Sequence, residues 1–205
     1  MGCIQLLATA NMKRALYTLL FAFVIANSYA QPCQPWGSAP VGSRRGNLNE
    51  LKNHAAVPPA DSAQDLELSS LLATPHGEDS DRFKNGTYVY TEGYLVSHKE
   101  EGAESCNCKE ATAEQKNGDV HIYIGQSPDA PKSDCIIVEI TPAFKRLHLD
   151  YNNLLIAGEH VRITGYLLYD FEHVSNAVNT CKKCTSVWRK TCWEIHPIVG
   201  INKID

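Results

Sequence analysis

The chain has 205 residues, and its 19 lysines and arginines stand against 23 aspartates and glutamates, for a formal net charge of −4 at pH 7. This acidic balance disfavours nucleic acid and other polyanions as partners, because their binding depends on a surplus of basic side chains. Hydrophobic residues make up 43% of the chain, which is enough for one domain with a real core, so no second domain is required.

Residues 1–30 have the pattern of a secretory signal peptide. The basic residues Lys13 and Arg14 precede an apolar run at 15–26, and small residues stand just before Gln31. The run is about a dozen residues long, short of the roughly 20 that cross a bilayer, which favours cleavage over a retained anchor. The sequence therefore predicts an exported protein, periplasmic or extracellular, with no stable membrane span after cleavage.

Residues 31–81 are rich in Pro, Gly, Ser, Ala and Asn, and they predict a flexible or partly helical arm. Short helical patterns occur around 48–53 and 63–72. After residue 81 the sequence changes to short β-rich runs separated by turn signals, so we expect the folded domain to span residues 82–205.

This second part contains five runs with strand character and one mixed segment, 144–155, with helical character. Apolar residues alternate with polar ones in most of the runs, as they do in half-buried strands. The five runs are 87–98, 119–125, 135–141, 160–171 and 193–201. Three strands, a helical segment and two more strands is the element order of an OB-fold. We therefore predict an all-β protein with small α content, a five-stranded OB-like Greek-key barrel with a loosely structured N-terminal arm. The alternative is another small barrel or sandwich.

Eight cysteines occur in the chain, and seven of them follow the predicted signal peptide. In an exported protein this usage favours disulfides, and the odd number leaves at least one thiol unpaired. A zinc site built from Cys-x-Cys and Cys-x-x-Cys pairs is the alternative. The disulfide candidates are Cys106, Cys108, Cys135, Cys181, Cys184 and Cys192.

Acidic and histidine side chains are expected to gather on one outer face of the barrel. The third and fifth strands of an OB barrel are parallel neighbours. Glu139 follows Cys135 by four residues, and His196 follows Cys192 by four residues. A register that brings the two cysteines level therefore also brings Glu139 level with His196. The candidate ligand or metal cluster comprises Asp119, His121, Glu139, Asp170, His173, Glu194 and His196. Such donors suit zinc, manganese or iron, and His121, Glu139 and His196 are the metal-ligand candidates. The alternative is ion pairing across a solvated face, with Asp170 capping a turn.

Five motifs in this order resemble a family of uncharacterised exported bacterial proteins with an OB-like β-barrel core. The motifs are ESCNC (104–108), DVHI (119–122), VEITP (138–142), ITGYLLYDFEH (163–173) and WEIHP (193–197). The resemblance covers roughly residues 85–202. It implies the fold and export, and it implies no reaction or ligand.

The sequence thus predicts an exported OB-fold-like binding or interaction module for an unknown ligand or envelope protein, with no cofactor predicted. The alternative is a metal-dependent, nuclease-like hydrolase that uses His121, Glu139, Glu194 and His196. The two histidines and one carboxylate would hold the divalent metal, and the other carboxylate would accept a proton from its bound water. A structural role in the envelope is a third hypothesis. A serine hydrolase has no support, because the chain lacks a Gly-x-Ser-x-Gly elbow.

Overall fold

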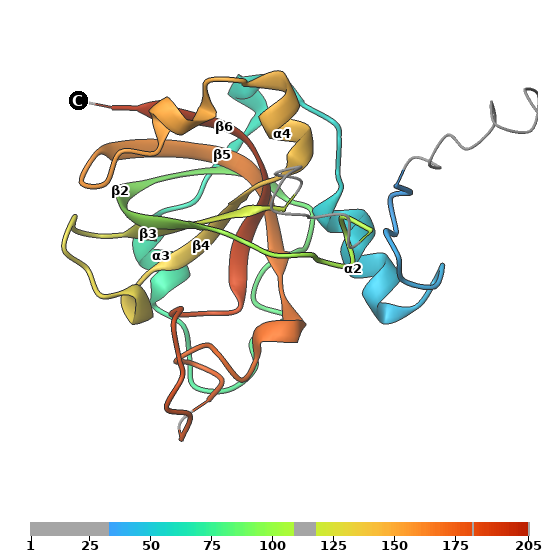
Figure 1. Ribbon diagram of the computed structural model, residues 1–205. Coiled ribbons are helices and arrows are strands. Elements are labelled where there is room, and N and C mark those ends of the chain that lie inside the picture. The colour runs from blue at the N-terminus through green and yellow to red at the C-terminus, as the bar shows by residue number, and fades with distance from the viewer. Residues whose placement is uncertain (1–32, 109–117, 182, 205) are drawn as a thin grey trace, which may run out of the picture. The chain divides into compact units, whose positions relative to one another are not determined.

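A computed structural model describes residues 33–108, 118–181 and 183–204 of the protein (Figure 1). Its main element is a closed barrel of five strands: β2 (Tyr88–Glu100), β3 (Val120–Gly125), β4 (Ile136–Ile140), β5 (His160–Tyr169) and β6 (Trp193–Lys203). The sheet order is β1-β2-β3-β4-β6-β5, and a further pairing between β2 and β5 closes the barrel. Strands β4 and β6 run parallel, and the other pairs of barrel strands are antiparallel. This topology confirms the OB-like barrel.

Alternation of apolar side chains explains how these runs form a barrel. In the first part of β2 the residues alternate between buried and partly buried, whereas every residue of β3 and β4 is buried. Both faces of β3 and β4 are therefore covered, the inner one by the core and the outer one by other segments. Trp193 and Ile195 belong to the core cluster, as the alternation in the last strand predicts.

The helical segment between β4 and β5 begins earlier than its sequence pattern suggests. Helix α4 (Pro142–Leu147) starts directly after β4, and the 3-10 helix η3 (Tyr151–Leu154) follows it. Thr141 caps α4 by accepting a hydrogen bond from the Phe144 amide, and Pro142 occupies the first turn, where a missing N–H costs nothing.

The described part of the N-terminal arm, from Cys33 to residue 81, is partly helical and packs against the barrel. It contains α2 (Arg44–Lys52), η1 (Ala60–Ser62), β1 (Gln64–Asp65) and α3 (Leu68–Leu72), and β1 pairs with β2. Leu68 and Leu71 are buried in the core, and Gly93 makes room for Leu68, because a Cβ at Gly93 would lie 2.6 Å from Leu68 Cδ2. This part of the arm is thus less loose than the composition of the segment predicts, since its few leucines fall on one helical face.

Two disulfides link Cys33 with Cys108 and Cys181 with Cys184. The prediction was right for Cys108, Cys181 and Cys184, and it missed Cys33. The structure differs from the prediction for the three remaining candidates, which are buried free thiols: Cys106, Cys135 and Cys192.

No helix within the described ranges is both long and apolar enough to cross a membrane.

Candidate metal centre on the outer face of the barrel

Three polar side chains meet where β3, β4 and β6 lie side by side. Strand register pairs His121 with Glu139, and the parallel register of β4 and β6 brings His196 level with Glu139, as expected from the sequence. Glu139 therefore lies between two imidazoles, with Oε1 2.8 Å from His121 Nε2 and Oε2 3.1 Å from His196 Nδ1.

This face is buried, so the expectation of ion pairs on a solvated surface is wrong. Asp119, Glu139 and Glu194 have 0% of their surface exposed, His196 has 1% and His121 has 4%. Segments distant in sequence cover them: α2 packs beside β6, and the chain between β5 and β6 contributes a buried arginine. Buried charges require partners, and the partners determine what the site can do.

Two permanent cations lie among these carboxylates, and sequence reasoning missed both. Arg189 is fully buried, and its Nη2 donates to Glu194 Oε2 at 2.6 Å while its Nε donates to the Thr191 carbonyl. Lys52, from α2, has its Nζ 3.3 Å from Asp170 Oδ2 and 3.6 Å from Glu104 Oε2. No local pattern marks either residue, because a basic side chain at the end of a helix or in a loop is ordinarily solvated.

The buried charges do not balance without the imidazoles or a bound cation. The permanent cations of the centre are Lys52 and Arg189. The fully buried carboxylates outnumber them by two: Asp119, Glu139, Asp170 and Glu194. Burial opposes protonation of His196, but Glu139 and Glu194 raise its pKa to about 10. Two imidazolium ions can neutralise the excess, and so can one divalent metal ion.

His121 and His196 are not equivalent as metal ligands. Both ring nitrogens of His121 face carboxylates, since Nδ1 lies 3.2 Å from Glu101 Oε1 and Nε2 faces Glu139. Burial lowers its pKa, but Glu139 and Glu101 together raise it above the usual value, which favours an imidazolium paired with a carboxylate at each ring nitrogen. In His196, by contrast, Nδ1 contacts Glu139 and Glu194, and Nε2 has no hydrogen-bond partner among the described residues.

Asp119 connects the Nε2 side of His196 to a second group of donor atoms. Asp119 Oδ2 lies 3.7 Å from His196 Nε2 and 3.8 Å from Cys106 Sγ, and Cys106 Sγ lies 3.4 Å from Glu104 Oε2. Burial and Glu139 outweigh the contact with His196 and raise the pKa of Asp119 to about 7. Burial, Asp119 and Glu104 also raise the pKa of the Cys106 thiol well above its usual range.

Ligand atoms in this region lie close enough together to share a metal ion. One group of donor atoms within 4.8 Å of one another comes from Asp119, Glu139 and His196. A second such group comes from Glu104, Cys106 and Asp119. A third such group joins Glu104, His121 and Glu139. Sequence reasoning missed Glu104 as a donor and considered Cys106 as a metal ligand only in a four-cysteine zinc site, although both residues lie in a motif that the family resemblance singles out.

The remaining predicted cluster residues form ion pairs at the edge of the centre. Asp170 accepts a hydrogen bond from the Glu172 amide at 2.9 Å, as expected for a turn cap, and its Oδ2 lies 2.8 Å from His173 Nδ1. Glu194 is bound to Arg189. Neither Asp170, His173 nor Glu194 belongs to the donor groups found in the described residues.

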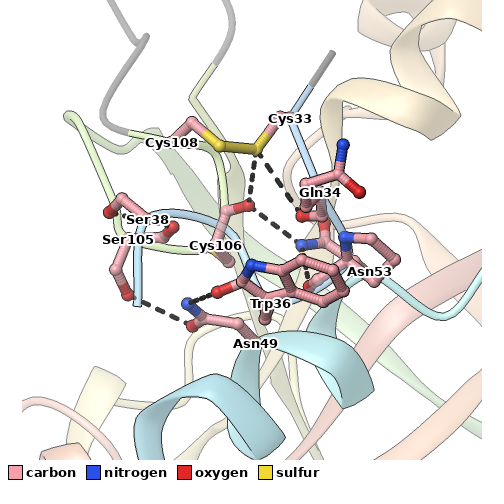
Figure 2. Close-up of a disulfide and its surroundings, with 10 residues drawn as sticks. Cys33, Gln34, Trp36, Ser38, Asn49, Asn53, Ser105, Cys106 and Cys108 are labelled. Atoms are coloured by element: carbon pink, nitrogen blue, oxygen red, sulfur yellow. Dashed lines mark hydrogen bonds between the residues drawn. A yellow bond between two sulfur atoms is a disulfide. The ribbon is translucent and has the colours of Figure 1, made fainter. Parts of the chain in front are cut away.

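The loop that carries Glu104 and Cys106 is held by the N-terminal segment (Figure 2). The Cys33–Cys108 disulfide ties the two together, and Asn53 Nδ2 donates to the Cys106 carbonyl at 2.9 Å. Gly37 permits the close approach, because it has φ +60° and a Cβ there would lie 1.9 Å from the Ser105 carbonyl oxygen. A cavity of 280 Å³ opens beside this loop, and Cys106 and Arg146 are among its lining residues.

No protein-family model matches this sequence, and a search of curated proteins gives no match. Solved structures with partial similarity include a small single-stranded DNA-binding protein from Streptomyces coelicolor, with 12% identity over 59% of this chain and 94% of that chain and a TM-score of 0.35. Asparaginyl-tRNA synthetase from Pyrococcus horikoshii has 10% identity over 59% of this chain and a TM-score of 0.32, and the match spans 20% of the synthetase. The Entamoeba histolytica enzyme has 13% identity over 63% of this chain and a TM-score of 0.32, and the match spans 23% of that chain. Similarities at these scores carry no inference about ligand, activity or partner.

Proposed function

We propose that the protein is an exported binding module that holds a divalent metal ion on the outer face of its barrel. In OB-folds the usual binding surface is the face of the second and third barrel strands, flanked by the loops after the first and fourth strands. In this protein those strands are β3 and β4. The donor residues Glu104 and Cys106 follow β2, and Asp170 follows β5, so the charged centre occupies the surface where this fold binds its ligands.

The observation that carries the proposal is the excess of two fully buried carboxylates over permanent cations in this centre, combined with His196 Nε2, which has no hydrogen-bond partner in the described part of the chain. A carboxylate without a counter-charge is costly to bury. A divalent ion beside Asp119 and His196 supplies the missing charge in one step, and imidazole nitrogen and carboxylate oxygen are common ligands of zinc, manganese and iron. The same carboxylates repel phosphate, which argues against nucleic acid as the ligand of this face.

Burial favours binding over hydrolysis. A hydrolytic metal needs an open position that substrate can reach, and a carboxylate free to accept a proton from the bound water. Glu139 and Glu194 are both fully buried, and both already pair with cations or imidazoles.

Export is supported by the signal-peptide pattern and by two disulfides, which persist in oxidising compartments. The mass of the secreted protein is expected to correspond to a chain that begins at Gln31. Alkylation of the denatured, unreduced protein should label the three free cysteines and no others. A mature protein that retains residues 1–30 and stays inside the cell would refute the export proposal.

Metal analysis tests the binding proposal. Protein without a polyhistidine tag, purified without chelator and incubated with Zn²⁺, Mn²⁺ and Fe²⁺ before dialysis, should retain stoichiometric metal. The variants His196→Ala and Asp119→Asn should lose it, while the exposed His76→Ala control should keep it. Circular dichroism and thermal unfolding establish that each variant is folded. Folded wild-type protein that retains no stoichiometric metal overturns the proposal, and so does retention by both centre variants.

A further inference from the structure

Cys106 is the free thiol whose surroundings differ most from a simple core position. It is 2% exposed, yet its sulfur lies 3.4 Å from Glu104 Oε2 and 3.8 Å from Asp119 Oδ2 rather than among apolar side chains alone. A thiol is a weak hydrogen-bond donor and can donate only one proton. Two carboxylates directed at one buried sulfur are therefore poorly explained by hydrogen bonding.

The donor atoms of Glu104, Cys106 and Asp119 lie close enough together to share one metal ion. Zinc binds sulfur at about 2.3 Å and oxygen or nitrogen at about 2.0–2.1 Å, which places sulfur about 3.5 Å from an oxygen ligand. The observed separations are 3.4 Å from Glu104 to Cys106 and 3.8 Å from Cys106 to Asp119. A shift of a few tenths of an ångström brings the second pair to that value.

His196 lies beside this group, because Asp119 belongs both to the donor group of Cys106 and to that of His196. A ligating imidazole ordinarily donates its other ring N–H to a carboxylate, which fixes the tautomer and directs the lone pair at the metal. His196 Nδ1 has Glu139 Oε2 at 3.1 Å and Glu194 Oε1 at 3.3 Å. Its Nε2 is buried, has no hydrogen-bond partner among the described residues and faces Asp119.

The disulfide next to Cys106 fixes the loop without consuming this thiol. Cys108 bonds to Cys33 (Figure 2), whereas the sulfur of Cys106, two residues earlier, lies 3.8 Å from Asp119 Oδ2. The Cys106 carbonyl is bound by Asn53, so the backbone on either side of the thiol is anchored. Burial protects Cys106 from oxidation in a compartment where exposed thiols pair.

We propose that Cys106 is a thiolate ligand of a metal ion that it holds together with Glu104 and Asp119, beside His196, and that the site therefore selects zinc or another thiophilic ion over magnesium and calcium. This inference rests on the proposed metal binding and identifies the metal class. As the sulfur–metal bond forms, the S–H bond breaks and its proton passes to solvent by way of the cavity that Cys106 lines. Thiolate ligands favour such ions, whereas magnesium and calcium prefer oxygen donors alone.

Cobalt substitution tests the thiolate directly. Co²⁺ bound to wild-type protein should show visible d–d bands together with an intense near-ultraviolet charge-transfer band from sulfur to cobalt. Cys106→Ser should lose the charge-transfer band and bind zinc at least about tenfold more weakly. Cys135→Ser is the matched control, because Cys135 is also a fully buried free thiol but lies outside the donor groups, and it should leave both spectrum and affinity unchanged.

The outcomes separate this inference from the proposed function. Wild-type d–d bands without a charge-transfer band, or a charge-transfer band that survives in folded Cys106→Ser, overturn the thiolate assignment while metal binding stands. Failure of the folded wild-type protein to bind either cobalt or zinc overturns the metal-binding proposal itself. The wild-type spectrum decides the thiolate assignment even if Cys106→Ser fails to fold.

Discussion

Removal of the Arg189 side chain should strongly destabilise the protein, because it leaves the Glu194 carboxylate without its permanent counter-charge. Both side chains are 0% exposed, and Arg189 Nη2 lies 2.6 Å from Glu194 Oε2. Breaking a buried pair on one side costs about 3–5 kcal/mol. With a urea m-value of about 2 kcal/mol per molar, this cost for Arg189→Ala corresponds to a midpoint lowered by about 1.5–2.5 M.

Urea unfolding followed by the fluorescence of the buried Trp193 measures this effect. Arg162→Ala is the matched control, because Arg162 also pairs with a glutamate, Glu92, but both side chains are substantially exposed, so the midpoint should hardly move. The variant Glu194→Gln should lower the free energy of unfolding less than Arg189→Ala does, since it removes the buried negative charge. A midpoint for Arg189→Ala close to that of the Arg162→Ala control would refute the account of a buried centre short of positive charge.

Three further predictions concern pH, packing and the N-terminal arm. Burial acts to raise the pKa of the Asp170 carboxyl, but Lys52 and His173 hold this pKa below the usual range. The Asp170 carboxylate therefore stabilises the folded state above pH about 4, and this stabilisation is lost progressively as the pH falls further. The stability difference between wild type and Asp170→Asn, measured with urea at pH 7 and pH 3, should therefore shrink at pH 3, and an equal difference at both values would contradict this. Gly165→Ala should cost about 1–3 kcal/mol in urea unfolding, because the new Cβ would lie 2.5 Å from the Pro197 carbonyl oxygen, and a neutral result would show that the strands separate there easily. Leu71→Ala should cost about 2–5 kcal/mol, because Leu71 is fully buried, whereas a loss below about 1 kcal/mol would mean that the arm contributes little to the core.

Much of the barrel can be predicted from the sequence because its strands have a local signature. The pattern of Val120, Ile122 and Ile124 marks a strand, and the spacing of Glu139 and His196 from their cysteines anticipates the parallel register of β4 and β6. The sequence also assembles the central acid and histidine residues correctly, since partners in neighbouring strands follow from topology and register.

The disulfides show where such reasoning fails. Cys33 lies 75 residues from Cys108, in a segment with no strand or helix pattern around it, and nothing local distinguishes it as a partner. Cys106 and Cys108 look alike in the sequence, yet one sulfur bonds to Cys33 and the other faces Asp119. Which thiol pairs depends on how the N-terminal segment lies against the loop.

The sequence by itself determines the strand runs, their order and which polar residues share an outer face, because a two-residue period and β propensity act over a few residues at a time. Only the tertiary structure decides that this face is buried. Lys52 reaches it from α2 and Arg189 from the segment before β6, and the result is a buried centre in which the carboxylates outnumber the permanent cations. Burial of that kind depends on packing between segments far apart in the chain, and no local pattern records it.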